Sequence, residues 1–275
     1  MSPCLVRLLT PDGLQPVSYT ADSLADAARY EPDDGVYTIT NTYHTFQVLK
    51  FDAHLDRLEE SARREGIPLR LDRPALRAAL RGMIQQAGYA ETRFRITVSR
   101  AQPEDFILSL EPFQPPPPQV YERGVRCVTL PDSARQNPAS KNTGWMHARE
   151  RFTLPPGIYT GLLLDADGLI LEGLSSNFYA VLDGELRTAG AGMLPGIAQQ
   201  VVFAVAPGVL PVRKTAVSVR DVPRLDEAFI TSSSRGIVPV VEIDGFLIGA
   251  GSPGPQTQAL MAAYRDWVQA HLEPL

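Results

Sequence analysis

Four consecutive prolines, Pro115 to Pro118, interrupt the chain near its middle within the sequence QPPPPQ. Proline fixes one backbone dihedral and lacks an N–H, so this run cannot lie inside a helix or a central strand and favours an extended stretch. Such a stretch is typical of a spacer between domains. The 275 residues also exceed the ~150 residues of a usual domain. The sequence therefore predicts domains at 1–113 and 125–275, joined by a linker at 114–124.

Composition indicates an ordinary globular protein. Hydrophobic residues make up 44% of the chain and charged residues 21%, which excludes collagens, coiled coils and largely disordered chains. The net charge of −5 disfavours a nucleic-acid-binding protein. The two cysteines, Cys4 and Cys127, form no CxxC motif and no cluster with histidine, so we expect free thiols and no metal site.

Neither a signal peptide nor a membrane span is expected. Arg7, Pro11 and Asp12 interrupt the apolar run at the N-terminus. The longest apolar stretch, Val201 to Val212, contains Pro207 and is shorter than the ~20 residues that cross a bilayer. These patterns predict a cytoplasmic protein that binds no membrane.

The first half of the chain predicts an α+β domain. Two strand-like runs, VYTIT and FQVLK, flank the polar NTYHT and predict a hairpin over 36–50. Helical spacing follows over 51–66 and over 74–88, and each helix is expected to end at a glycine. The strand-like runs RFRITVS and FILSLEPF complete the order ββααββ, which is typical of an α+β unit.

Short strand patterns dominate the second half of the chain. They occur at VRCVTL, IYTGLLLD, LILEGL, NFYAVLD, ELRT, AVSV and EAFIT, and VPVVEIDGFLI predicts a hairpin at Asp244-Gly245. Helices are predicted for WMHARERF, PGIAQQVVFAVA and PQTQALMAAYRDWVQAHL.

Three motifs for other chemistries fail. The four histidines form no HExxH motif and no HxH pair. GLSSN at 173–177 lacks the final glycine of a nucleophile elbow, and a strand follows it in place of a helix. GAGSPG at 249–254 matches a dinucleotide-binding fingerprint, but too few residues follow it to complete a βαβ unit.

Five segments carry a family resemblance in their order along the chain. They are GVYTITNTYHTFQVLKFDAHLDRLEESARREGI, ASKNTGWMHARERF, EGLSSNFYAV, GMLPGIAQQVV and DEAFITSSSRGIVPVVEIDGFLIGAGSPGP. Together they resemble the class IV, or fold-type IV, pyridoxal-phosphate enzymes: the branched-chain and D-amino-acid aminotransferases and 4-amino-4-deoxychorismate lyase. The resemblance implies a two-domain α+β fold. A small sandwich-like N-terminal domain precedes a larger C-terminal domain with a mixed, barrel-like sheet and helices.

The resemblance also implies pyridoxal 5'-phosphate as the cofactor and a role for each site residue. Lys141 is implied to form a Schiff base with the cofactor aldehyde and to carry the proton. Glu172 is implied to keep the pyridine nitrogen protonated, and Arg57 to bind the phosphate. The further implied cofactor contacts are Ser176, Asn177, Gly196, Ile197, Ala198, Ser233 and Ser234.

Tyr30, Tyr37, Thr38 and Arg100 are implied substrate-side positions, in a homodimer whose active site lies at the interface. From the residue patterns alone, ordinary alternatives stay open: Lys141 as a surface lysine, Glu172 as a carboxylate at a strand end, and Arg57 as half of a surface ion pair.

The chain departs from the family pattern in three places. Trp145 and Met146 stand where many members carry a tyrosine that contacts the cofactor ring oxygen, and TITN replaces the EGIR of branched-chain enzymes. Gln102 replaces the histidine that D-amino-acid enzymes pair with an arginine. Two functions therefore stay open. One is an aminotransferase that acts between an amino acid and a 2-oxo acid; the other is a lyase that releases pyruvate to give 4-aminobenzoate.

Overall fold

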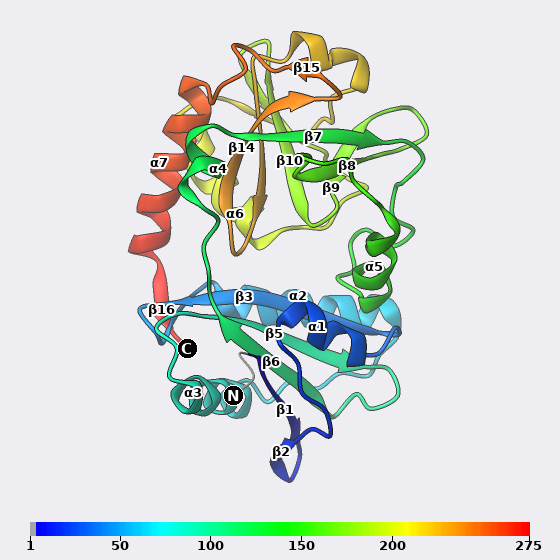
Figure 1. Cartoon of the computed structure of the whole chain (residues 1–275), viewed down its shortest axis with the longest axis vertical. Helices are drawn as coiled ribbons and strands as arrows, with labels where there is room; N and C mark the ends of the chain where they lie inside the picture. The colour runs from blue at the N-terminus through cyan, green and yellow to red at the C-terminus, as the bar shows by residue number, and fades with distance from the viewer. Residues whose placement is uncertain (1–3) are drawn as a thin grey trace. The chain divides into compact units, whose positions relative to one another are not determined.

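The computed structural model describes residues 4–275 as two compact units (Figure 1). The first unit contains residues 4–114 together with Ser140–Ala148 and His271–Leu275. The second contains Pro115–Ala139 and Arg149–Ala270. The predicted ranges were continuous, and the observed division differs because these two later segments bond to strands of the first unit.

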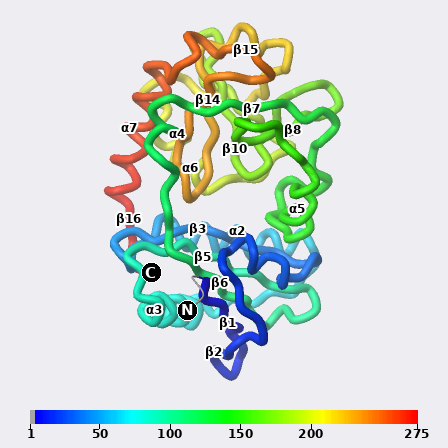
Figure 2. Tube along the Cα trace, in the orientation of Figure 1, coloured from blue at the N-terminus to red at the C-terminus, as the bar shows by residue number. Residues whose placement is uncertain are grey.

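An antiparallel seven-stranded sheet forms the first unit, in the order β16-β4-β3-β5-β6-β1-β2. Figure 2 shows the red C-terminal end of the chain among the blue and cyan segments of this unit. The strands are β1 (Leu5–Thr10), β2 (Gly13–Pro16), β3 (Gly35–Tyr43), β4 (Gln47–Leu49), β5 (Thr92–Ser99), β6 (Phe106–Pro112) and β16 (Leu272–Pro274). The predicted hairpin of β3 with β4 and the two strands β5 and β6 are confirmed. Strands β1, β2 and β16 were not predicted.

Two helices, α2 (Phe51–Glu65) and α3 (Arg73–Ala87), pack their apolar faces into one core with this sheet. Both helices were predicted, and both end as expected at glycines, Gly66 and Gly88, which adopt a left-handed φ of 68°. The side chain of Asp72 caps the start of α3. A second, smaller core contains residues of the short helix α1 (Leu24–Ala27). The 3-10 helix η1 (Ala28–Tyr30) follows α1.

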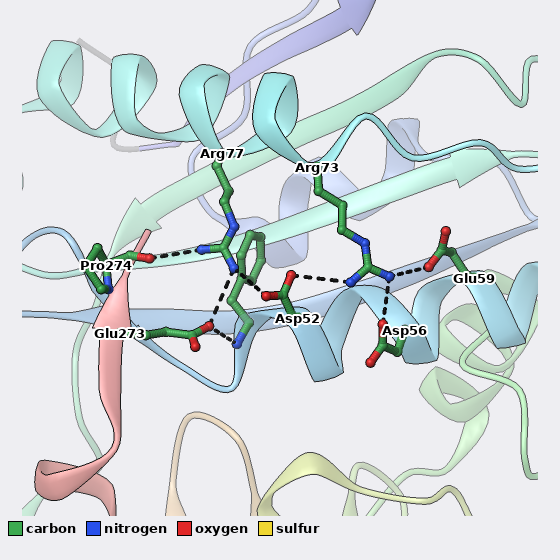
Figure 3. A network of polar contacts seen from close by, with 8 residues as sticks. Asp52, Asp56, Glu59, Arg73, Arg77, Glu273 and Pro274 are labelled. Carbon is green, nitrogen blue, oxygen red and sulfur yellow. Dashed lines mark hydrogen bonds and ion pairs between the residues drawn. The ribbon is translucent and has the colours of Figure 1, made fainter.

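On the outer side of these helices, two arginines of α3 join α2 and β16 (Figure 3). Arg73 forms ion pairs with the carboxylates of Asp52, Asp56 and Glu59 on successive turns of α2. Arg77 pairs with Asp52 and Glu273 and donates a hydrogen bond to the carbonyl of Pro274. These contacts add to the pairing of β16 with β4 that places the end of the chain in the first unit.

The second unit is built on a nine-stranded mixed sheet. Its strands are β7 (Val125–Leu130), β8 (Thr160–Leu164), β9 (Ile170–Gly173), β10 (Ser176–Leu182), β11 (Glu185–Arg187), β12 (Val212–Arg213), β13 (Glu227–Ser232), β14 (Gly236–Ile243) and β15 (Phe246–Leu247). Strands β10-β13-β14-β7-β8-β9 form a closed ring, because β9 also pairs with β10. Two neighbouring pairs in the ring, β14–β7 and β7–β8, are parallel. The predicted mixed, barrel-like sheet is confirmed.

The helices of this unit are α4 (Pro118–Glu122), η2 (Arg149–Arg151), α6 (Ile197–Val205), η3 (Ala206–Gly208), η4 (Val219–Arg224) and α7 (Pro255–Ala270). Helix α4 lies inside the predicted extended linker; its proline occupies the first turn, where the missing N–H costs nothing. The strand predicted over 216–219 does not form: within this range Ser218 makes only an isolated bridge to Leu169, and η4 begins at Val219. A capping box of Ser218 and Asp221 stabilises the start of η4.

Two further expectations from the sequence concern a membrane span and a metal site. No helix within residues 4–275 is long and apolar enough to cross a membrane. Among the same residues, no group of three or more histidine, cysteine or acidic side chains is placed to hold a metal ion.

Candidate active site

The main chain of Lys141 is fixed on both sides by residues of the first unit. Its carbonyl accepts the N–H of Tyr37 at 3.0 Å, and its own N–H donates to the hydroxyl of Ser61 at 3.0 Å. Helix α5 (Thr143–Ala148) begins two residues later, and the side chain of Asn142 accepts the N–H of Trp145 in its first turn. Residue 141 is therefore presented from a rigid segment between β3 and α2.

The Lys141 amino group lies over an aromatic face. Its Nζ is 4.6 Å from the centroid of the Tyr37 ring, a cation–π distance. The Tyr37 ring is buried and packs with Ala28 and Met146. The chain contains three lysines, and the other two are Lys50, at the start of α2, and the exposed Lys214.

Arg57 lies on α2, where its Nη2 donates to the hydroxyl of Thr38 at 3.4 Å. Thr38 in turn lies 2.9 Å from the Nδ1 atom of His54, and both side chains are buried. Burial lowers the pKa of Arg57 to about 10, against a smaller opposing effect of Tyr37. The guanidinium therefore remains charged at neutral pH.

Ser61 joins the segments that carry Arg57 and Lys141. It is fully buried on α2 one turn after Arg57. Its hydroxyl donates to the Arg57 carbonyl at 2.7 Å and accepts the Lys141 N–H.

Glu172 is a buried carboxylate of the second unit. It lies near the end of β9, and its Oε1 is 3.4 Å from the guanidinium of Arg135, with both side chains 5% exposed. Its Oε2 accepts the N–H of Leu194 at 3.1 Å. The interpretation of Glu172 as an exposed strand-end residue is therefore excluded, because its carboxylate is buried beside a cation.

The first turn of α6 has the properties of an anion site. Gly196 precedes the helix, and no side chain caps it. The N–H groups of the first turn have no partner within the helix, which applies to Ile197 and Ala198. A side chain at position 196 would collide with the Asn177 amide, which is held by the carbonyl of Leu194 at 2.8 Å. This turn therefore offers main-chain donors that no side chain caps.

The remaining predicted cofactor residues lie at two turns of the second unit. Ser233 and Ser234 form the turn between β13 and β14. The neighbouring Arg235 donates to the hydroxyl and carbonyl of Ser175, which joins this turn to the one that precedes β10. The hydroxyl of Ser176 is buried and has no hydrogen-bond partner among the described residues.

Two of the predicted substrate-side residues lie in exposed positions. Tyr30 is 52% exposed and stacks on Tyr19. Arg100 is exposed, and its Nε donates to Asp34 at 2.6 Å. Tyr37 and Thr38, in contrast, are buried beside Lys141 and Arg57, as described above.

Sequence reasoning missed three residues of this arrangement: His54, Ser61 and Arg135. His54 carried a usable signal, because it lies three residues before Arg57 and thus on the same face of the predicted helix. Ser61 is one turn beyond Arg57 on the same helix, but a serine in a helix does not indicate which group its hydroxyl contacts. Arg135 lies in a polar loop, and no local pattern relates it to Glu172.

The family model described as amino-transferase class IV matches residues 35–243. The chain belongs to the class IV aminotransferases. This class IV aminotransferase is 26% identical over 254 residues to the D-alanine aminotransferase of Bacillus licheniformis, covering 86% of the chain and 88% of that protein. It is 33% identical over 120 residues to the branched-chain-amino-acid aminotransferase of Pseudomonas aeruginosa, covering 42% of the chain and 39% of that protein.

Its fold matches a branched-chain amino acid aminotransferase from T.th. that was solved with pyridoxamine 5'-phosphate. The TM-score is 0.81 at 19% sequence identity, and the match covers 98% of each chain. The predicted family, fold class, enzyme class and cofactor are confirmed: this class IV aminotransferase depends on pyridoxal phosphate. The relatives reported above are aminotransferases, so the comparisons favour this function over the lyase.

The described residues fit that cofactor. Pyridoxal phosphate combines an aldehyde, a basic ring nitrogen and a phosphate, and the class IV aminotransferase supplies an amine at Lys141, a carboxylate at Glu172 and a guanidinium at Arg57. The uncapped start of α6 behind Gly196 suits an anion. The buried Ser176 hydroxyl adds a donor that no described residue satisfies.

Proposed function

We propose that this aminotransferase binds pyridoxal phosphate covalently through Lys141 and moves an amino group between an amino acid and a 2-oxo acid. The observation that carries the proposal is the fixed main chain of Lys141, held by Tyr37 and Ser61. An amine that bonds an aldehyde and then transfers protons needs a main chain held in a fixed position.

The other residues act around this amine in the roles that the resemblance implies. The bound cofactor supplies a ring that accepts electrons from the substrate. Glu172 holds a proton on the ring nitrogen, because a neighbouring anion favours the cationic form. Arg57 binds the phosphate through charge-assisted hydrogen bonds, supplemented by the main-chain N–H groups of Ile197 and Ala198.

With the cofactor and substrate bound, the Lys141 Nζ would accept the proton from the substrate's Cα. The Tyr37 face limits the directions that this amine can take. Ser176, Asn177, Ser233 and Ser234 complete the proposed cofactor contacts. Tyr30 and Arg100 are proposed to contact the substrate as part of a homodimer, and the protein is proposed to be cytoplasmic.

We infer an aliphatic amino acid as the donor. The named relatives act on D-alanine and on branched-chain amino acids, and both classes carry small apolar side chains. Incubation with L-leucine, L-alanine and D-alanine in separate single-turnover reactions identifies the donor by the conversion of bound cofactor to its amino form. Conversion by none of the three would contradict the aliphatic donor.

Borohydride reduction tests the covalent assignment. Reduction followed by peptide mapping is expected to find the cofactor on the peptide that contains Lys141. Lys214→Arg is the matched control, since it removes an exposed lysine and should retain the label. Labelling at Lys50 or Lys214 in the parent protein would overturn the proposal.

A further inference from the structure

Thr38, predicted as a substrate-side residue, is buried between two basic side chains of α2. Its hydroxyl oxygen lies 2.9 Å from His54 Nδ1 and 3.4 Å from Arg57 Nη2. Thr38 belongs to β3, whereas His54 and Arg57 are three residues apart on α2 and therefore share a face. Both Thr38 and His54 are 1% exposed. Little of the Thr38 side chain is thus accessible to a substrate.

The chemistry of the guanidinium fixes the direction of one of these hydrogen bonds. A guanidinium has donors and no acceptor, so the Thr38 oxygen accepts from Arg57. The direction of the Thr38–His54 bond depends on the His54 tautomer, and we assign the proton of His54 to Nε2, so that Nδ1 accepts the Thr38 hydroxyl hydrogen. Burial, Arg57 and Lys141 all lower the pKa of His54 well below its ordinary value, which keeps the imidazole neutral.

We propose that Thr38 and His54 are positioning residues for Arg57 and hold its guanidinium in place for the phosphate of the cofactor. The proposal rests on the proposed role of Arg57. A neutral acceptor suits this task, because a carboxylate in the place of Thr38 would compete with the phosphate for the same cation. His54 fixes the rotation of the Thr38 hydroxyl, and so keeps its lone pair directed at Arg57.

A purely structural role of this pair, joining β3 to α2, makes a different prediction. Loss of a structural contact would weaken the binding of any cofactor form, whereas loss of a contact that serves the phosphate would weaken only phosphorylated forms. Pyridoxal, which keeps the aldehyde and ring but lacks the phosphate, separates these cases.

The experiment compares equilibrium binding of pyridoxal phosphate and of pyridoxal by the full chain after removal of bound cofactor. Thr38→Val keeps the side-chain shape and removes the hydroxyl. It is expected to weaken pyridoxal phosphate binding by about tenfold and to leave pyridoxal binding within about twofold. Thr38→Ser restores the hydroxyl and should bind pyridoxal phosphate like the parent protein. His54→Phe should show the same selective loss, and the double variant should lose no more than either single one.

Thr42→Val is the matched control, because Thr42 is a buried threonine of the same strand whose hydroxyl accepts the N–H of Thr92 at 2.9 Å. It should not change the ratio of the two affinities. An unchanged ratio in Thr38→Val, or in His54→Phe should Thr38→Val not fold, would overturn the proposal.

Arg57→Ala distinguishes failure of this inference from failure of the proposed function. If Arg57→Ala also leaves the ratio unchanged, Arg57 does not bind the phosphate and the proposed function is wrong at that residue. If Arg57→Ala lowers the affinity for pyridoxal phosphate relative to that for pyridoxal and Thr38→Val does not, only the positioning role fails.

Discussion

The hydroxyl of Ser61 accepts the main-chain N–H of Lys141 at 3.0 Å, although 80 residues separate them in sequence. The same hydroxyl donates to the carbonyl of Arg57. One buried serine thereby sets the position of the proposed cofactor lysine relative to the helix that carries the proposed phosphate ligand.

We expect Ser61→Ala to weaken pyridoxal phosphate and pyridoxal binding to the same degree, because it releases the main chain of Lys141 and leaves Arg57 on its helix. An unsatisfied buried N–H should also cost about 1–3 kcal/mol of stability. Binding titrations and denaturant unfolding measure the two effects. Ser133→Ala is the control, since Ser133 likewise donates to one carbonyl and accepts one main-chain N–H, both in the second unit. Equal affinity losses in both variants would contradict the expectation.

Glu172→Gln should lower turnover by about 10²-fold, or ~2.7 kcal/mol on the barrier, while cofactor binding largely survives. The amide keeps the shape of the carboxylate and removes the charge that favours the protonated ring nitrogen. Steady-state kinetics of the loaded enzyme measures the effect. Glu227→Gln offers a matched control, because Glu227 is another buried strand glutamate that accepts main-chain N–H groups, here at the start of α7. A parent-like rate in Glu172→Gln would leave the electron-sink role unassigned.

Arg135→Met should destabilise the second unit by about 3–5 kcal/mol, since it removes one partner of a buried ion pair with Glu172. In the Glu172→Gln background the same change should cost clearly less. A double-mutant cycle by denaturant unfolding measures this coupling. The exposed pair of Arg126 and Glu242 is the comparison, and we expect less than ~1 kcal/mol there. Additive effects of the two substitutions at 135 and 172 would disprove the coupling.

The neutral His54 predicts a loss of stability in mild acid. Its folded-state pKa lies below the unfolded value of about 6.5, so the unfolded chain binds the additional proton. The stability of a fold with a neutral His54 is therefore fully present above a pH of about 6.5. It is lost as the pH falls below this value, at up to ~1.4 kcal/mol per pH unit. His54→Phe should reduce the slope of unfolding free energy against pH between about 6.5 and 5. Parallel curves for the parent and the variant would refute the assignment.

Local patterns predicted the elements whose stability is itself local. Helices α2 and α3 follow from apolar spacing and from Gly66 and Gly88, which take a conformation that other residues adopt at a cost. The β14–β15 hairpin likewise follows from its Asp244-Gly245 turn.

Elements and pairings that depend on distant partners were not predicted. Strand β16 exists because Leu272 to Pro274 find the edge of β4, more than 220 residues earlier in the chain. The parallel pairing of β7 with β14 joins Cys127 to Ile243, more than a hundred residues apart in sequence. The Glu172 ion pair belongs to the same class, because nothing near Arg135 in sequence indicates which acid it meets.

The pairing of β16 with β4 also bears on the synthesis of the chain. A ribosome makes residues 4–114 first, yet the outer edge of β4 receives its partner strand only when residues 272–274 have emerged. Until then the nascent sheet presents unpaired backbone groups, which other chains can join. Although most of the first unit is made early, it is completed last.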